Sequence, residues 1–161
     1  MIEFIKADNS NINDIIDLAH KSWFQTYEKI NSKEQNEYMF SIWYSVDGLL
    51  DQMKKGEVFW IMKISNQSIG FSSISALTSQ TFKLNKIYLL PNQQGKGLGK
   101  MFLKHLEQYA LANGANEIIL NVNRNNIAIK FYESCHYNII KEEDIPFGSY
   151  WMNDFVMRKT L

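Results

Sequence analysis

A glycine-rich loop is the part of the sequence best suited to hold a ligand. Residues 94–100 read Gln-Gly-Lys-Gly-Leu-Gly-Lys, between an expected strand over 84–90 and an expected helix that begins near Leu98. At the start of a helix, unpaired backbone N–H groups and the helix dipole favour an anion, and glycines let the backbone approach a phosphate closely. The loop therefore predicts an anion site; the alternative is a turn that uses glycine only for its positive φ.

This segment fits neither of two common phosphate-binding loops. A P-loop needs a glycine six positions before the lysine of its Lys-Ser/Thr pair, but Gln94 stands six positions before Lys100, and Met101 replaces the hydroxyl residue. A dinucleotide-binding fingerprint needs a glycine three positions after its second one, and Gly97 is followed there by Lys100. Binding of an ordinary nucleotide phosphate stays open as a third interpretation.

The pattern Gln-x-x-Gly-x-Gly resembles the acetyl-CoA pyrophosphate loop of the GNAT superfamily of N-acetyltransferases. The resemblance implies that the cofactor contacts Gln94, Gly95, Lys96, Gly97, Leu98, Gly99 and Lys100. The preceding Ile87-Tyr88-Leu89-Leu90-Pro91 resembles the family's fourth strand, which bulges and pairs its main chain with the pantetheine arm. Leu89 and Leu90 are therefore the expected pantetheine contacts.

A second signature lies downstream, in the pattern Asn125-x-x-Ala128-x-x-Phe131-Tyr132. In the GNAT superfamily the asparagine contacts the cofactor, and the tyrosine hydroxyl lies near the thioester sulfur as the general acid. The resemblance thus implies a cofactor contact at Asn125 and a catalytic acid at Tyr132. Relatives continue this helix into Gly-Phe, whereas this chain has His-Tyr at 136–137, which puts the turn in doubt but leaves the catalytic tyrosine intact.

Acetyl transfer by direct attack in a ternary complex requires a neutral amine. An ammonium with a pKa of ~10.4 is neutral in only about one molecule in a few thousand at pH 7, so the site must help to remove a proton. A carboxylate acting through water, or desolvation of the amine, could do so, and Tyr132 would protonate the leaving thiolate. A covalent route through Cys135 is disfavoured, because a lone cysteine is usually a small buried apolar residue. His20, His105 and His136 are too scattered to predict a metal site.

The acetyl acceptor is expected to enter over the first two helices and the last strands. Aromatic and acidic residues in these segments would suit a cation, and the expected substrate-binding residues are Trp23, Tyr27, Glu28, Trp151 and Asp154. Each residue type is more often part of a core or a surface, so the prediction rests on the grouping. Four segments, 87–88, 97–100, 128–132 and 154–161, resemble bacterial spermidine/spermine N-acetyltransferases of the PaiA type, which implies a polyamine or another small primary amine.

Hydrophobic periodicity predicts the elements that position these residues. Besides the strand over 84–90 and the helix that starts near Leu98, we expect a first strand at 2–7, helices over 12–19 and 32–48, a hairpin of 57–64 and 68–77, a strand at 118–122 buried on both faces, a short helix at 128–135, and closing strands at 137–140 and 155–157. This order predicts an α/β (α+β) fold, in which a mixed sheet with helices on both sides contains one βαβ crossover over 84–122. The resemblance to the GNAT superfamily implies that the sheet is mostly antiparallel with six to seven strands, that about four helices flank it, and that its central βαβ unit binds acetyl-CoA. The strands carrying Leu89 and Val122 should splay apart.

Length and composition narrow the class of protein. The 161 residues predict a single domain over 1–161, and 17 basic against 17 acidic residues leave no net charge to attract nucleic acid. A single cysteine excludes an internal disulfide framework and favours the cytoplasm. The longest apolar run, 58–62, is far shorter than the ~18–20 residues that cross a bilayer, so no membrane segment is expected. GNAT proteins are commonly dimers, which suggests a homodimer.

The sequence therefore predicts a cytoplasmic, acetyl-CoA-dependent N-acetyltransferase acting on a small-molecule amine without a metal. The alternative from another class is a non-catalytic CoA-binding sensor or assembly module. His136 and the absence of an identifiable base motivate that alternative, and Tyr132 speaks against it.

Overall fold

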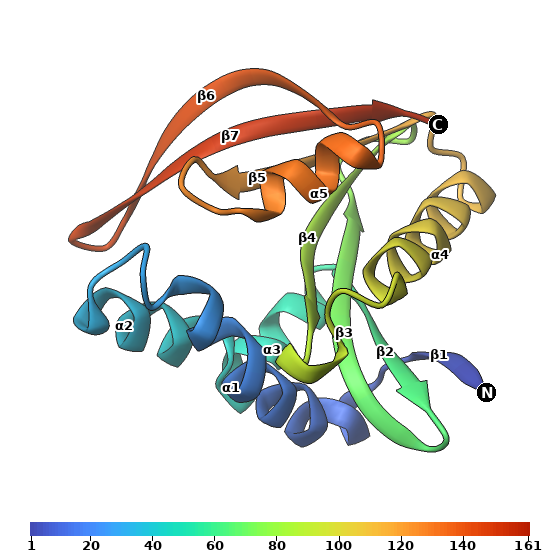
Figure 1. Ribbon diagram of the computed structural model, residues 1–161, viewed down its shortest axis with the longest axis horizontal. Coiled ribbons are helices and arrows are strands. Elements are labelled where there is room, and N and C mark those ends of the chain that lie inside the picture. The colour runs from blue at the N-terminus through green and yellow to red at the C-terminus, as the bar shows by residue number, and fades with distance from the viewer.

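One seven-stranded sheet runs through the whole chain (Figure 1), and the computed structural model describes residues 1–161. The strand order is β1-β2-β3-β4-β5-β7-β6, and every neighbouring pair is antiparallel except β4 and β5, which are parallel. The strands are β1 (Ile2–Lys6), β2 (Val58–Ile64), β3 (Gln67–Ala76), β4 (Thr81–Leu89), β5 (Glu117–Asn123), β6 (Asn138–Phe147) and β7 (Tyr150–Thr160). This is the predicted mixed, mostly antiparallel sheet, with the predicted βαβ unit at its centre.

Helices cover both faces of the sheet (Figure 1). They are α1 (Ile12–Tyr27), α2 (Lys33–Trp43), α3 (Val46–Lys54), α4 (Leu98–Ala112) and α5 (Ala128–Ser134), with short 3-10 turns at Asn9–Asn11 and Pro91–Gln93. One apolar core joins α1, α2 and α3 to the sheet, and a second joins α4 and α5 to the opposite face. None of these helices combines the length and the apolar composition that crossing a membrane requires.

The segment expected as one helix over 32–48 is two helices in the structure. Helix α2 ends at Trp43. The side chain of Ser45 then caps α3 by accepting a hydrogen bond from the N–H of Gly48 at 3.0 Å. Gly48 therefore lies in the first turn of α3 and ends no helix. A Cβ at this glycine would lie 2.0 Å from the carbonyl oxygen of Ile42, so glycine allows α3 to pack closely against the end of α2.

The two parallel strands separate halfway along their length. Residues 81–84 of β4 pair with residues 117–120 of β5, and no pairing continues beyond Leu84. Leu84 and Lys86 pair with successive residues of β3, so Asn85 between them forms a bulge. Both the splay and the bulged strand were predicted. One edge of β4 from Asn85 to Leu89 is thereby left without a neighbouring strand, which makes its backbone groups available to a ligand.

Strand β5 corrects one expectation, because it is not buried on both faces. Its residues alternate between buried and half-buried along the strand. Ile118, Leu120 and Val122 pack into the core beneath α4 and α5. The opposite face carries Asn121 and Asn123, which point toward the space opened by the splay. The alternation is that of a strand with one face in the core and one toward a polar cavity.

The burial of His105 on α4 makes the stability of the fold depend on pH. The ring of His105 stacks on the ring of Phe4, with 4.3 Å between the ring centroids, and packs edge-on against Trp60, with 4.4 Å between the centroids. Its Nε2 has no hydrogen-bond partner. Burial lowers the pKa of His105, so the unfolded chain takes up the proton first as the pH falls. Stability is therefore lost as the pH drops below the unfolded pKa of ~6.5.

We expect His105→Phe to preserve the stacking and to remove this loss. Between pH 7.5 and pH 5, the melting temperature of the wild type should fall further than that of His105→Phe, as measured by differential scanning fluorimetry. His20→Phe is the control, because His20 also stacks on aromatic rings but is exposed. Equal pH dependence in the wild type and His105→Phe would contradict this role.

Candidate active site

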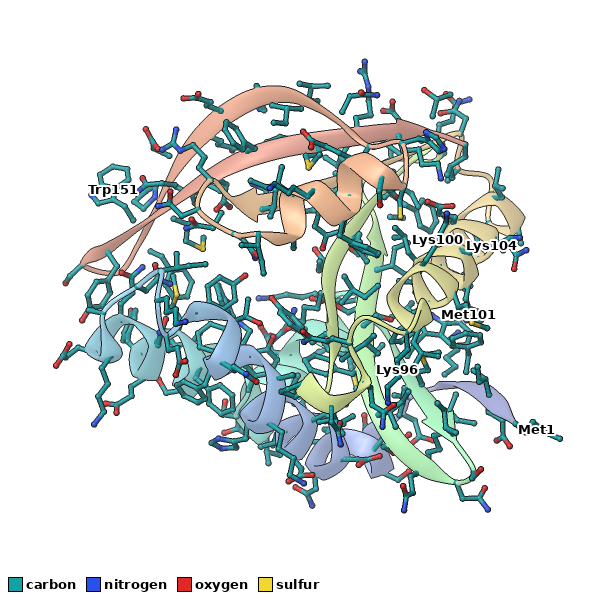
Figure 2. All side chains as sticks on the ribbon, viewed as in Figure 1. Met1, Lys96, Lys100, Met101, Lys104 and Trp151 are labelled. Carbon is teal, nitrogen blue, oxygen red and sulfur yellow. The ribbon has the colours of Figure 1, made fainter.

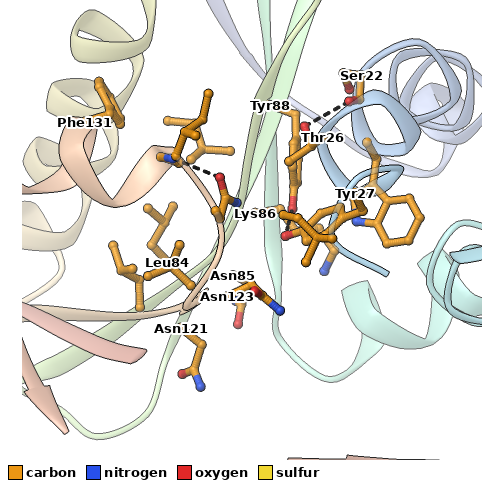
Figure 3. Close-up of a pocket in the computed structure, with 18 of the residues that line it drawn as sticks. Ser22, Thr26, Tyr27, Leu84, Asn85, Lys86, Tyr88, Asn121, Asn123 and Phe131 are labelled. Carbon is orange, nitrogen blue, oxygen red and sulfur yellow. Dashed lines mark hydrogen bonds between the residues drawn. The ribbon is translucent and has the colours of Figure 1, made fainter. Parts of the chain in front are cut away.

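A cavity of about 1050 Å³ opens where β4 and β5 separate (Figure 3). Its wall is formed by β4, β5, the loop before α4 and the start of α5 on one side, and by α1 and the loop after it on the other. The sequence-predicted residues that line it are Trp23, Tyr27, Glu28, Leu89, Gln94, Gly95, Gly97, Gly99, Lys100, Asn125, Tyr132 and Asp154. The structure thus brings together most of the predicted cofactor, catalytic and acceptor residues.

Four predicted residues lie outside the cavity lining. The side chain of Leu98 is buried in a core cluster with Phe102, and Leu90 packs against the α1 side of the sheet. Lys96 projects from the loop (Figure 2), where its Nζ lies 3.3 Å from Oε1 of Gln93. Trp151 is 57% exposed near the tip of the β6–β7 hairpin (Figure 2), so the structure does not bring its ring to the acceptor region.

The loop presents a run of backbone N–H groups with no partner in the protein. The amides of Gly95, Lys96 and Gly97 donate to no acceptor, and those of residues 98–100 lie in the first turn of α4, whose first helical bond is Met101 N–H to Gly97 O. Gly95 and Gly97 have φ angles of +74° and +78°, and a Cβ at either would meet no atom within 4 Å. Open space therefore lies over free donors at a helix N-terminus, which fits a pyrophosphate.

Gln94 and Gly99 fix this loop relative to its neighbours. The Nε2 of Gln94 donates to the carbonyl oxygen of Leu89 at 3.2 Å, which ties the loop to the end of β4. A Cβ at Gly99 would lie 3.4 Å from the ring of Phe131, so this glycine allows α4 to approach α5 closely. The glycines at 95 and 97 therefore allow the turn and also leave open space over free amides, so the two interpretations of the loop are compatible.

Tyr132 reaches the cavity from α5. Its side chain is only 9% exposed, and its hydroxyl makes no hydrogen bond within the protein. Burial raises the pKa of Tyr132 far above that of a free phenol, so the hydroxyl is protonated throughout the physiological range. Across the cavity, the hydroxyls of Tyr27 and Tyr88 lie 3.2 Å apart (Figure 3), and burial raises the pKa of each. The hydroxyl of Tyr132 is thus a proton donor without a partner, and it faces two phenols that form a hydrogen bond with each other.

A buried ion pair that the sequence analysis missed lies beneath α3. Nζ of Lys86 lies 2.5 Å from Oε1 of Glu57 and 2.6 Å from Oε1 of Gln52, and the two charged side chains are 11% and 14% exposed. Burial lowers the pKa of Lys86, and the charge of Glu57 opposes that shift. No local pattern in the sequence indicates that Lys86 pairs with Glu57. Because the pair is internally neutral, it leaves no free charge for a ligand.

Removal of one member of this pair should destabilise the fold strongly. We expect Glu57→Gln to lower the free energy of unfolding by about 3 kcal/mol, because the ammonium of Lys86 would stay buried without its counter-ion. Glu37→Gln removes an exposed ion pair with Lys33, 3.8 Å apart, and should cost less than ~1 kcal/mol. Urea denaturation measures both variants. Similar small losses in both would show that Lys86 does not depend on Glu57.

Asp154 lies on the cavity side of β7, opposite Asn123 of β5. It is 8% exposed, and its Oδ2 accepts a hydrogen bond from Nδ2 of Asn121 at 3.4 Å. Burial raises the pKa of Asp154. By contrast, Glu28 is exposed at the end of α1. The acceptor region therefore contains one buried and one exposed carboxylate among its predicted residues.

Cys135 and His136 are both away from the cavity. Cys135 is 4% exposed within the core beneath α5, as expected for a structural thiol, and it does not line the site. His136 adopts φ +70°, the left-handed conformation usually taken by glycine, and the N–H of Tyr137 still donates to the carbonyl of Tyr132 at 3.0 Å. The turn after α5 is therefore retained, although histidine replaces glycine.

A comparison with protein families identifies this arrangement. The model of the Acetyltransferase (GNAT) family matches residues 12–137, which include the glycine loop, the splayed strands and Tyr132. The chain belongs to the GNAT family. It is an acetyl-CoA-dependent N-acetyltransferase, and its seven-stranded mixed sheet is the GNAT fold.

Individual relatives agree with this assignment. The spermidine N(1)-acetyltransferase of Thermoplasma acidophilum is 29% identical over 98% of this chain and 96% of its own length. The crystal structure of the PaiA N-acetyltransferase from Thermoplasma acidophilum in complex with coenzyme A superposes with a TM-score of 0.84 at 28% identity, covering 100% of this chain and 99% of that one. The ribosomal-protein-S18-alanine N-acetyltransferase of Escherichia coli shares the fold, with a TM-score of 0.76 at 15% identity over 99% and 94% of the two chains. The resemblance to the PaiA type is thereby confirmed.

Proposed function

We propose that this GNAT protein transfers the acetyl group of acetyl-CoA to a primary amine of a polyamine, by direct attack in a ternary complex. The observation that carries the proposal is that one cavity joins the free amides of residues 95–100 to the free hydroxyl of Tyr132. These are the two ends at which a CoA thioester needs binding: its diphosphate and its sulfur. Residues 1–161 form one catalytic domain in this proposal, since a single sheet runs through them.

Each part of the cavity has a role in this proposal. The amides of the glycine loop, with Lys100 beside them, hold the pyrophosphate. The unpaired edge of β4 up to Leu89 pairs with the amides of the pantetheine arm, as an added strand would, and Asn125 contacts the cofactor from the loop between β5 and α5. Tyr132 gives its proton to the departing sulfur. No metal is required for these steps.

The polyamine acceptor is supported by two independent observations. One relative that matches nearly the whole chain is a spermidine N(1)-acetyltransferase. The acceptor side of the cavity combines the half-buried ring of Tyr27 with the carboxylates of Glu28 and Asp154, which suits a chain bearing several ammonium groups. The fold alone would not select this acceptor, since the same fold serves an enzyme named for a ribosomal-protein alanine.

A panel of amines tests the proposal. Thiol release from acetyl-CoA would be measured with spermidine, spermine, free amino acids and lysine-containing peptides. We expect the largest kcat/KM with the polyamines. A larger value with amino acids or peptides would refute the acceptor. CoA binding without thiol release from any amine would instead favour the non-catalytic sensor or assembly module.

A further inference from the structure

We propose that Asp154 is the general base that removes the proton from the acceptor ammonium. This inference rests on the proposed function, in that it requires an amine acceptor in the cavity, but it does not depend on which amine is used. It assigns the residue that the sequence motifs leave unidentified.

The position of Asp154 follows from the pairing of β5, β7 and β6. Asp154 stands opposite Asn123 on β5 and Glu143 on β6. Because side chains alternate along a strand, Asp154 shares the cavity face with Asn121 and Asn123, which Figure 3 shows across the cavity from Tyr27. The carboxylate thus faces the acceptor region from the floor of the sheet.

Asp154 is buried without a counter-ion. No lysine, arginine or histidine nitrogen lies within 4.0 Å of its carboxylate, and its one hydrogen bond, from Asn121, is long at 3.4 Å. Arg124 is near, but its guanidinium already bonds Glu142 at 2.9 Å and also Asp144. The other charged neighbours are Lys83 on β4, which partly compensates the carboxylate, and Glu143, which opposes its ionisation. An ammonium entering the cavity would supply the missing positive charge.

The other cavity carboxylates are less suited to this task. Glu57 is already neutralised by Lys86 and also accepts a hydrogen bond from the hydroxyl of Ser73. Glu28 is exposed, so water would screen its interaction with an amine. Asp154 and Tyr132 also share a neighbour, because the hydroxyl of Tyr27 interacts electrostatically with both. A base and an acid therefore face the same part of the cavity.

The proton balance of the reaction closes with these two groups. The acceptor ammonium gives one proton to the carboxylate of Asp154, and the nitrogen lone pair forms the bond to the acetyl carbon as the carbon–sulfur bond breaks. The sulfur takes the proton of Tyr132, and the new amide nitrogen loses its second proton, which restores the phenol. Asp154 then releases its proton to solvent. Burial raises the pKa of Asp154. The difference between its pKa and that of the ammonium is therefore smaller, and the carboxylate is a stronger base.

The pH dependence of Asp154→Asn tests this role. The substitution preserves the size of the side chain and a partner for Asn121. With the amine that the wild type uses best, kcat/KM at pH 7 should fall by about 10²–10³-fold, mainly through kcat. Near pH 10 the loss should shrink to less than about tenfold, because roughly a quarter of an amine with a pKa of ~10.4 is then already neutral, against about one molecule in a few thousand at pH 7. Asp51→Asn is the control: it removes an exposed carboxylate on α3 that pairs with Lys55 and does not line the cavity, and it should change kcat/KM by less than about twofold.

The outcomes separate this inference from the proposed function. A loss of equal size at pH 7 and pH 10, or a rise in KM with unchanged kcat, would overturn Asp154 as the base. A wild type that prefers an amine other than a polyamine would refute only the polyamine acceptor. In that case, a kcat/KM ratio of wild type to Asp154→Asn that is large at pH 7 and small near pH 10 would still support Asp154 as the base. A wild type inactive with every amine would overturn both proposals.

Discussion

Replacing Tyr132 with phenylalanine should lower kcat for acetyl transfer by about 10²–10³-fold and leave the affinity for CoA within about twofold. The hydroxyl makes no hydrogen bond within the protein, so its loss leaves no buried partner unsatisfied and the fold should keep its stability. What is lost is the proton for the departing sulfur. Thiol release under saturating substrates measures kcat, and isothermal titration calorimetry with CoA measures the affinity.

Tyr137→Phe is the matched control for this substitution. Tyr137 is also buried and follows the same helix, but its hydroxyl donates to Oε1 of Glu107 at 3.0 Å and lies outside the cavity. Its removal should lower stability by about 1 kcal/mol and leave kcat within a factor of about two. An unchanged kcat in Tyr132→Phe would show that the thiolate obtains its proton elsewhere.

The second large effect is expected at Gly97. Gly97→Ala should weaken CoA binding by about 10–100-fold, because the added methyl group projects into the open space over the free amides and strains a residue with φ +78°. Gly56→Ala separates the effect of backbone strain from the effect of the methyl group on CoA binding. Gly56 also has a positive φ, +97°, with no atom within 4 Å of a Cβ, but it lies in the turn between α3 and β2.

Both glycine variants should lose about 1–2 kcal/mol of stability from backbone strain. Only Gly97→Ala should lose affinity for CoA, as measured by calorimetry. If the two variants bind CoA equally well, the loop does not contact the diphosphate.

The sequence predicted those features that local patterns encode. Alternating and helical periodicities located the strands and most helices, and the glycines between β4 and α4 located the loop whose amides are free. The break between β4 and β5 was predicted through the family resemblance and is confirmed by the end of their pairing at Leu84. Tyr132 was predicted from its motif, and the structure adds that its hydroxyl is free.

Features that depend on contacts distant in sequence were missed or misplaced. The ion pair of Lys86 with Glu57 joins residues 29 positions apart, and no local spacing indicates it. The break before Ser45 depends on the packing of α3 against α2, whereas the apolar pattern continues across it. The ring of Trp151 is exposed outside the cavity, while its backbone carbonyl accepts a hydrogen bond from Nε2 of Gln35 on α2, a residue 116 positions away.

The most direct measurement is a crystal structure of the protein with CoA and spermidine. We expect the pyrophosphate oxygens within hydrogen-bond distance of the amides of residues 95–100, the pantetheine arm along the unpaired edge of β4, and the sulfur beside the hydroxyl of Tyr132. A diphosphate bound elsewhere, with those amides in contact only with solvent, would contradict the assignment of this loop as the CoA-binding site.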